Sequence, residues 1–436
     1  MNEIIQPRIL KGFRDFLPQQ ETIRAGLIDT VTAVFRSFGF VPIDTPVLEY
    51  SDILLRKSDG ETEKQVFRFK DNGERDVALR FDLTVPFARF VAEHREELPF
   101  PFKRYHVAKV WRGEKPQAGR YREFVQCDFD IVGSESVSSD FEILLMIKAA
   151  FEALEVPAVT VRLNHRGLFN AFLARIGIAD KSEGVLRAID KLGKIGREQT
   201  AALLTEVTGS AGTAEEILAY TAADDFTDFD ATVSRLEDLA GGSPEAARGI
   251  GRLRELGRAA QDAAPGFFVL DPSITRGLDY YTGIVYETFL NDLPEIGSVC
   301  SGGRYDNLAG LYMKERLPGV GASIGLDRLV AALEKLAALP ALLPGMDALI
   351  FCQDASLFAH YHRLAASLRA RGMSVEVYPD PKPAGKQYQY AEKKGTRFAV
   401  LCTPEDAARG VVSVKNLANR EIREHLTAEE MADIIA

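Results

Sequence analysis

The chain has 436 residues, of which 46% are hydrophobic and 27% are charged, and its formal net charge is −10. That length allows about three domains of roughly 150 residues each, and the composition excludes a wholly disordered chain and a collagen-like fibre. No window reaches the roughly 20 consecutive apolar residues of a membrane span, so we expect no membrane partner.

The N-terminal residues 1–18 lack the continuous apolar core of a secretory signal. The four cysteines lie far apart, without a CxxC pair or a Cys/His cluster: Cys127, Cys300, Cys352 and Cys402. This spacing argues against a structural zinc site and a disulfide framework, so we expect no zinc and a reducing, cytoplasmic location.

The charge is unevenly distributed along the chain. Residues 206–245 hold ten acidic side chains against one basic side chain, whereas residues 382–420 hold eight basic side chains against three acidic ones. The second segment could attract a polyanion, because local fields govern encounter. A solvated basic surface without a partner explains the same pattern.

The first 164 residues alternate between helix and strand patterns. Residues 21–38 carry apolar side chains at helical spacing and end at Gly39, which is typical of a helix C-terminus. Further patterns predict a helix at 140–154 and strands at 40–44, 77–81, 104–111, 123–132 and 159–163. Loops rather than helices join most of these strands, which favours an antiparallel sheet covered by helices.

The pattern becomes helical over residues 165–265. Strand-like runs then return at 267–270, 284–289 and 298–301, and a helix follows at 325–336. We therefore expect one α+β domain in two parts, 1–164 and 266–337, that is interrupted by a helical insertion at 165–265.

A proline-containing linker is expected at 338–346. Beyond it, strand patterns at 348–352, 374–378 and 398–401 alternate with helix patterns at 356–371 and 387–394. Such alternation indicates a compact α/β domain with a largely parallel sheet, at 347–436.

Chemistry-bearing residues concentrate first in residues 112–130, RGEKPQAGRYREFVQCDFD, which read as a hairpin. Its loop is rich in arginine, whose planar fork suits phosphate and carboxylate oxygens. On the returning strand the two-residue repeat places Gln126, Asp128 and Asp130 on one face, where burial without partners is costly. An exposed hairpin with surface ion pairs is the alternative interpretation.

Three further segments carry candidate ligand groups. Residues 276–287, RGLDYYTGIVYE, combine Arg276 with a strand bearing Tyr280 and Tyr281, although a tyrosine-rich core strand would look the same. Residues 319–329, GVGASIGLDRL, place glycines ahead of a helix that bears Arg328, but without the spacing of a dinucleotide-binding fold.

The third segment, LRFDLTVP at residues 79–86, is predicted to place Asp82 and Thr84 on one strand face. A capping Asp or Thr in a turn explains these residues equally well. His106 lies on an apolar strand and is interpreted as a core histidine. His360 and His362 do not share a helix face, which argues against a metal pair.

Together these segments resemble a class II aminoacyl-tRNA synthetase, and specifically the histidyl-tRNA synthetase family. The helix at 21–38, the hairpin at 112–130 and the glycine-rich segment at 319–329 resemble the three class motifs. The strings KGFRDFLP, RGLDYYTG and SGGRYD are more specific to this family. The resemblance runs from about residue 8 into the C-terminal domain.

The resemblance implies a two-step reaction, in which ATP and L-histidine form histidyl-adenylate before the histidyl group moves to tRNA(His). It also implies the role of each candidate residue. Arg112 and Arg276 would be catalytic at the α-phosphate, and ATP would be held by Arg112, Glu114, Arg120 and Arg328. Histidine would be held by Asp82, Leu83, Thr84, Arg112, Gln126, Asp130, Arg276, Tyr280 and Tyr281.

The same resemblance implies partners beyond the small substrates. The 347–436 domain resembles an anticodon-binding domain, with Lys386, Lys393 and Lys394 as tRNA contacts. The family implies a homodimer and Mg²⁺ entering with ATP. The chain reads FDLT where many bacterial members read PEGT, carries Asp130 where many carry a glutamate, and has Gly113 where many have a second arginine.

Two non-catalytic interpretations stay open at this point. One is a histidine-binding regulator of ATP phosphoribosyltransferase, but such relatives lack the C-terminal domain and the Arg276 equivalent. The other is a tRNA-sensing module without catalysis, against which the three arginines Arg112, Arg276 and Arg328 argue.

Overall fold

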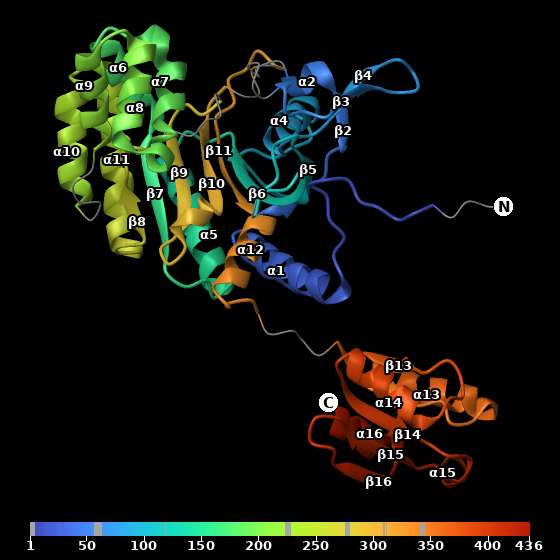
Figure 1. Cartoon of the computed structure of the whole chain (residues 1–436). Coiled ribbons are helices and arrows are strands. Elements are labelled where there is room, and N and C mark those ends of the chain that lie inside the picture. Colours follow the sequence, from blue (N-terminus) through green and yellow to red (C-terminus); the bar gives the residue numbers. More distant parts are fainter. Residues whose placement is uncertain are drawn as a thin grey trace. The chain divides into compact units, whose positions relative to one another are not determined.

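In a computed structural model, the chain forms two compact units, residues 1–339 and 340–436 (Figure 1). The structure describes residues 5–55, 63–117, 119–222, 228–274, 280–307, 310, 312–340 and 345–436. Each unit is described by itself below.

The first unit is built on an eight-stranded sheet. Its strand order is β1 (Val41–Pro42), β5 (Phe102–Trp111), β6 (Glu123–Val132), β11 (Gly319–Gly325), β10 (Cys300–Tyr305), β9 (Ile284–Leu290), β7 (Val159–His165) and β8 (Phe268–Leu270). Only the outer pairs, β1 with β5 and β7 with β8, are parallel among these strands. The expected antiparallel sheet is therefore confirmed.

Helices and a small second sheet surround these strands. The helices of the first unit outside the insertion include α1 (Pro18–Ser37), α2 (Ser51–Leu55), α4 (Thr84–Glu93), α5 (Val137–Ala153) and α12 (Leu326–Lys335). The small antiparallel sheet has the order β2 (Leu48–Tyr50), β4 (Asp76–Leu79) and β3 (Arg68–Lys70).

A block of helices lies between β7 and β8, as the helical pattern predicted. It comprises α6 (Arg166–Arg175), α7 (Ser182–Ile189), α8 (Leu192–Thr208), α9 (Ala211–Thr221), α10 (Phe229–Ala240) and α11 (Pro244–Ala263). Side-chain caps begin four of these helices, because His165, Ser210, Asp228 and Ser243 accept hydrogen bonds from backbone N–H groups of the first turn.

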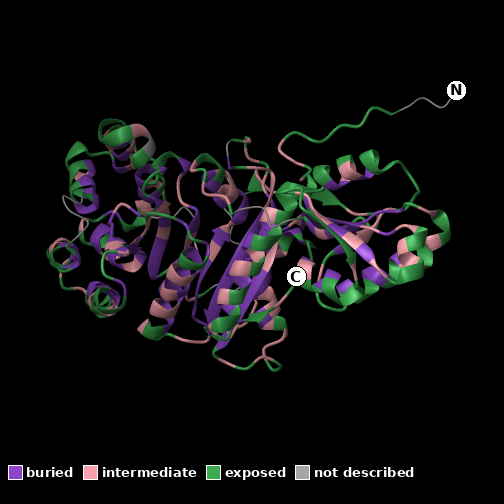
Figure 2. Ribbon diagram, turned by 90° about the horizontal axis from the view of Figure 1, so that it is seen from below, coloured by how far each residue is buried: buried purple, intermediate pink, exposed green. Residues whose placement is uncertain are grey.

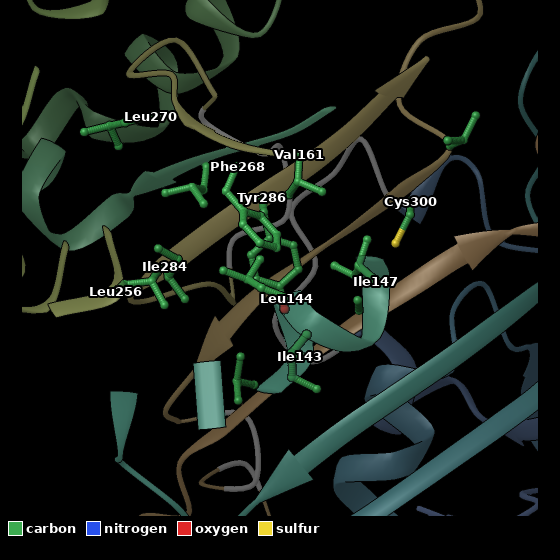
Figure 3. Close-up of a cluster of buried hydrophobic side chains, with 14 of the residues drawn as sticks. Ile143, Leu144, Ile147, Val161, Leu256, Phe268, Leu270, Ile284, Tyr286 and Cys300 are labelled. Atoms are coloured by element: carbon green, nitrogen blue, oxygen red, sulfur yellow. The ribbon is translucent and has the colours of Figure 1, made fainter. Parts of the chain in front are cut away.

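The helical block shares one hydrophobic core with the sheet. In Figure 3, Leu144 of α5, Tyr286 of β9 and Leu256 of α11 lie in the same cluster of buried side chains. Figure 2 shows the sheet strands buried and the outer faces of the helices exposed. Apolar contact therefore fixes the helical block against the sheet edge.

The second unit has a five-stranded mixed sheet. Its order is β13 (Val375–Val377), β12 (Met346–Ile350), β14 (Thr396–Leu401), β15 (Val412–Asn416) and β16 (Ile422–Leu426), with α13 (Phe358–Arg369), α14 (Ala384–Lys393), α15 (Pro404–Arg409) and α16 (Ala428–Ile435). The first three strands are parallel, as predicted, but β15 and β16 pair antiparallel.

The two faces of this second sheet are covered by different helices. Phe398 and Val400 of β14 lie in a cluster with Tyr361 of α13 and Met431 of α16, whereas Ala399 clusters with Ala391 of α14. Because alternate strand residues face opposite sides, α14 covers the face opposite to α13 and α16.

The glycine-rich residues 319–325 precede the helix α12, which begins at Leu326 as predicted, and they form the central strand β11. One local prediction was wrong. Asp82 and Thr84 do not share a strand face, because β4 ends at Leu79 and Thr84 begins α4. Asp82 instead accepts a hydrogen bond from the Val85 backbone N–H at 3.1 Å, so the capping alternative was correct.

Candidate active site

The centre of the large sheet carries a row of buried polar side chains. Backbone pairing sets Arg104 of β5 opposite Asp130 of β6, and His106 opposite Asp128. On the other side of β6, Gly321 lies opposite Asp130 and Ser323 opposite Asp128. Cross-strand partners point to the same face of a sheet, so the predicted shared face of β6 gathers groups from β5 and β11 as well.

Asp130 is held by two partners that the sequence did not suggest. Its carboxylate lies 2.6 Å from the Arg104 guanidinium and accepts a 2.5 Å hydrogen bond from the Tyr305 hydroxyl. Burial raises the pKa of Asp130, while Arg104 and Tyr305 oppose that rise. Asp130 thus pairs inside the protein, and it can act on a ligand through this network rather than as an isolated anion.

Gly321 makes this arrangement possible. A Cβ atom at that position would lie 2.0 Å from the Asp130 carboxylate oxygen and 2.7 Å from the Phe129 carbonyl oxygen. A glycine in the strand thus permits the close approach of a buried side chain, as expected for strand glycines near a site.

Asp82 adds a second buried carboxylate. It is 2% exposed, and its Oδ2 atom has no hydrogen-bond partner among the described residues. Burial raises its pKa to about 6, although Arg112 and Arg104 lower it. The neighbouring Leu83 is fully buried.

Gln126 and Asp128 extend the row along β6. The Gln126 Nε2 group donates a 2.7 Å hydrogen bond to Ser323 Oγ, and its Oε1 atom has no partner in the described part of the chain. Burial raises the pKa of Asp128 to about 7, with Arg104 opposing that rise and Asp130 adding to it. These carbonyl and carboxylate oxygens suit a cationic ammonium group.

Two tyrosines form an aromatic wall beside this row. The rings of Tyr280 and Tyr281 lie 4.6 Å apart, and Tyr280 lies 6.3 Å from the ring of Tyr305, which bonds Asp130. Burial raises the pKa of Tyr280 well above its ordinary value, and Thr84 and Asp82 are among the groups that affect it. The tyrosines therefore belong to the same pocket as Asp82, Thr84 and Asp130.

Three arginines gather where the hairpin loop meets α12. Burial lowers the pKa of Arg328 to about 10, and the positive charges of Arg120 and Arg112 lower it further. The acids Glu287 and Glu114 act in the opposite direction. Gly119 lies close to Arg328, since a Cβ atom there would be 3.3 Å from its Cγ atom.

Arg112 joins this arginine cluster to the polar row. Its Nε atom donates a 2.9 Å hydrogen bond to the Phe81 carbonyl oxygen, one residue before Asp82, and its guanidinium lies 5.2 Å from the Phe124 ring centroid. The guanidinium groups of the cluster repel one another, so they would bind the polyanionic part of a ligand, and the buried acids beside them would bind a cationic part of the same site's ligands.

Two arginines near the N-terminus bind the acid that precedes Arg328 on α12. The Asp327 carboxylate, one residue before Arg328, lies 2.6 Å from Arg14 and 2.5 Å from Arg24 and accepts a 2.7 Å hydrogen bond from the Val125 backbone N–H. The sequence analysis did not identify this contact. It joins α12, β6 and α1 around one buried acid.

Three further predictions concern Arg276, Arg120 and His106. Arg276 lies outside the described residues. Arg120 is exposed and lies 3.7 Å from Glu114. His106 is buried as expected, with its Nε2 atom 2.9 Å from the Asp44 carboxylate, but its Nδ1 atom has no partner among the described residues.

In the second unit, two of the three predicted lysines have free surface positions. Lys386 and Lys393 are exposed and lie seven residues apart on α14, on the same side of the helix. Lys394 instead pairs with Glu376 at 2.5 Å, and its ammonium group lies 5.0 Å from the Tyr390 ring centroid. Glu376 therefore neutralises part of the Lys394 charge within the unit.

Sequence reasoning missed Arg104, Tyr305 and Ser323 as site residues. An arginine at the centre of an otherwise apolar strand was the available signal for Arg104, because such a residue needs a buried acid. In the described part of the chain, no group of three or more His, Cys, Asp or Glu residues could hold a metal ion, and no helix is long and apolar enough to cross a membrane.

Comparison with known proteins assigns both units. The family described as "Histidyl-tRNA synthetase" matches residues 12–329, and the family described as "Anticodon binding domain" matches residues 347–436. The curated protein "Histidine--tRNA ligase" of Treponema denticola is 53% identical over 100% of this chain and 99% of its own. That of Rhodopirellula baltica is 48% identical over 99% of this chain and 98% of its own.

Solved structures agree with this assignment. A histidyl-tRNA synthetase from a Nostoc species superposes with a TM-score of 0.86 at 31% identity and covers 99% of both chains. A Bacillus halodurans structure, described as an ATP phosphoribosyltransferase regulatory subunit/histidyl-tRNA synthetase, has a TM-score of 0.76. It is 21% identical and covers 92% of this chain and 99% of its own, and at that identity it shows the shared fold alone.

Proposed function

This chain belongs to the histidyl-tRNA synthetase family, and we propose that it joins L-histidine to tRNA(His) in two steps at the expense of ATP. One observation carries the proposal. The arginine cluster of Arg112, Arg120 and Arg328 lies beside a buried pocket, where Asp82, Gln126 and Asp128 each have an oxygen without a partner among the described residues. The ammonium group of an amino acid needs such oxygens, and the phosphates of a nucleoside triphosphate need such arginines beside them.

Histidine binding follows from the polarity of the pocket. The Asp82 carboxylate and the Gln126 carbonyl oxygen would accept hydrogen bonds from the α-ammonium group, with Thr84 beside them. The imidazole would lie against Tyr280 and Tyr281 and be read by the Asp130 network. A site that hydrogen-bonds both ring nitrogens rejects apolar analogues, because its own buried polar groups would be left unpaired.

In the first step a carboxylate oxygen of histidine attacks the α-phosphorus of ATP. The bond between that phosphorus and the bridging oxygen to the β-phosphate breaks, and pyrophosphate leaves. Arg112 and Arg276 would stabilise the charge that develops on the α-phosphate oxygens, and Arg328 would hold the γ-phosphate with help from Arg120. Fixed cations at phosphate oxygens supply most of the catalysis in such transfers.

Glu114 would bind the adenine amino group, and Glu287 completes the acidic side of the nucleotide site. Both carboxylates act on Arg328, so oxygen ligands of the kind Mg²⁺ prefers are present. Mg²⁺ would enter with ATP and neutralise charge on the β- and γ-phosphates. The residues named above bind and orient the nucleotide.

In the second step the terminal ribose hydroxyl of tRNA(His) attacks the activated carbonyl carbon, loses its proton, and AMP leaves. The second unit would hold the anticodon stem through Lys386 and Lys393, with a smaller contribution from Lys394. We propose that the enzyme works as a homodimer, like its family. We also propose that it works in the cytoplasm.

The test is the charging of purified tRNA with each of the twenty amino acids, together with histidine-dependent exchange of pyrophosphate into ATP. We expect histidine alone to support both reactions. A regulatory protein that binds histidine without catalysis would show no exchange, and that result would overturn the proposed function.

Arg276→Ala should lower the exchange rate by orders of magnitude, and near-normal exchange would refute the role given to Arg276.

A further inference from the structure

The side-chain amide of Gln126 has two chemically different ends, and only one orientation suits a cationic ligand. Its Nε2 group donates to Ser323 Oγ at 2.7 Å, and the Oε1 atom is buried without a partner among the described residues. If the amide were rotated by half a turn, a donor would face the ligand in place of an acceptor. The contact with Ser323 therefore decides what the pocket offers.

A hydroxyl group could in principle hold the amide in either orientation, because it both donates and accepts. Asp128 removes this ambiguity. It is 2% exposed and lies opposite Ser323 in the β6–β11 register, and the Ser323 hydroxyl lowers its pKa, as a donor to the charged form does. Burial raises the pKa of Asp128 to about 7, so above that pH the group is an ionised carboxylate that only accepts. There the serine proton points to Asp128, and the serine oxygen is left to accept from Gln126.

We propose that Ser323 and Asp128 are positioning residues, which orient the Gln126 amide so that its carbonyl oxygen faces the α-ammonium group of bound histidine. The inference rests on the proposed function and extends it to Ser323, and it gives Asp128 a role through Gln126 besides that of its own oxygen in the pocket. The hydrogen-bond direction runs from Gln126 to Ser323 to Asp128, across two strands.

A structural role for Ser323 would predict something different. In that case the hydroxyl would merely satisfy a buried polar group, and its removal would lower the stability of the protein and affect both substrates alike. The positioning role confines the loss to histidine and makes it depend on the Gln126 amide.

The experiment is calorimetric titration of the full chain with L-histidine, and separately with ATP, for the wild type, Ser323→Ala, Ser323→Thr and Asp128→Asn. We expect Ser323→Ala to weaken histidine binding by about ten- to a hundredfold, the range for a misdirected hydrogen bond to a charged group, while ATP affinity changes less than twofold. Ser323→Thr keeps the hydroxyl and should retain most of the affinity. Asp128→Asn should resemble Ser323→Ala.

A double-mutant cycle with Gln126→Ala isolates the mechanism. If Ser323 acts through the amide, Ser323→Ala should cost nothing further in the Gln126→Ala protein, so the two losses should not add. The matched control is Thr288→Val, which removes another buried strand hydroxyl. Thr288 pairs with Cys300 on β10 in the apolar core and should leave histidine affinity unchanged.

The outcomes separate the inference from the proposed function. Unchanged histidine affinity in Ser323→Ala, additive losses in the cycle, or an equal loss for ATP would each overturn the positioning role while leaving the function intact. A wild-type chain that binds no histidine would overturn the function, and the positioning role with it. Steady-state exchange gives the same division, because the histidine KM should rise in Ser323→Ala while the ATP KM stays within twofold.

Discussion

The two units of this chain differ in whether they bury charged side chains. The first buries many ionisable side chains, namely Arg24, Glu49, Arg80, Asp82, Arg104, His106, Asp128, Asp130, Asp140, His165, Arg166, Asp271, Arg304 and Asp327. In the described residues 345–436 of the second unit, no Asp, Glu, Lys, Arg or His side chain is buried. The second unit keeps its basic residues on exposed surfaces such as α14.

This difference follows from what each unit has to recognise. A small charged substrate must be held in a site that excludes water, where each protein charge acts strongly but must also be paired. A nucleic-acid backbone can be met by solvated lysines, which need no buried partner. Charge therefore becomes part of the folding problem in the first unit and stays largely independent of it in the second.

The largest expected effect is on catalysis by the arginine cluster. Arg112→Ala should lower the histidine-dependent exchange rate by about a thousandfold, because one preorganised cation at the α-phosphate is lost. The measurement is the exchange rate at saturating ATP and histidine. Lys109→Ala is the matched control, since Lys109 pairs with Glu123 on the exposed part of the same strands and should exchange at the normal rate. An equal loss in both variants would contradict the assignment.

The buried ion pair should dominate stability. Asp130→Asn leaves the fully buried Arg104 without its charged partner, which costs about 3–5 kcal/mol for such pairs. Urea unfolding of the catalytic unit measures the loss. Asp76→Asn, which breaks the exposed ion pair with Arg68, should cost much less. Comparable losses in the two variants would erase the distinction between buried and surface charge.

Buried acids should make stability depend on pH. Burial raises the pKa of Asp128 from 3.8 to about 7, and the like charges of Asp130 and Asp82 add to this rise. The charge of Arg104 and the Ser323 hydroxyl oppose it. Between about pH 4 and 7 the folded chain therefore holds a proton that the unfolded chain has released. The free energy of unfolding should fall as the pH rises through this range.

Asp128→Asn isolates that contribution. The difference in unfolding free energy between wild type and variant should change by a few kcal/mol between pH 5 and pH 8, at about 1.4 kcal/mol per pKa unit. The variant should gain relative to the wild type at the higher pH. A difference that stays constant over this range would show that Asp128 titrates normally.

The smallest effect should be on tRNA binding by the second unit. Lys386→Glu should weaken tRNA affinity by about tenfold at low salt and less at high salt, since each lost phosphate contact reduces the salt dependence. Adenylate formation should stay at the wild-type rate. Arg363→Glu on α13, which covers the other face of this sheet, is the matched control. Equal losses of tRNA affinity in both variants would remove α14 as the binding face.

Local patterns in the sequence determined much of this protein. Two-residue alternation predicted the strand at 123–132 with the bounds that β6 has, and it placed Gln126, Asp128 and Asp130 on one face. Helical spacing predicted α1 and the helical block. Family-specific strings pointed to the chemistry. These features depend on neighbours in the chain, which is why they can be read from it.

Only the tertiary structure decided what each polar group meets. Gln126 and Ser323 are 197 residues apart, and Asp130 and Tyr305 are 175 apart, so pairing in the sheet rather than local spacing brings them together. The sequence predicted only that the glycines of 319–325 precede a helix, and the register of β11 then placed Gly321 against Asp130. Register between distant strands is set by the packing of the whole sheet, and that register alone determined which buried charge received which partner.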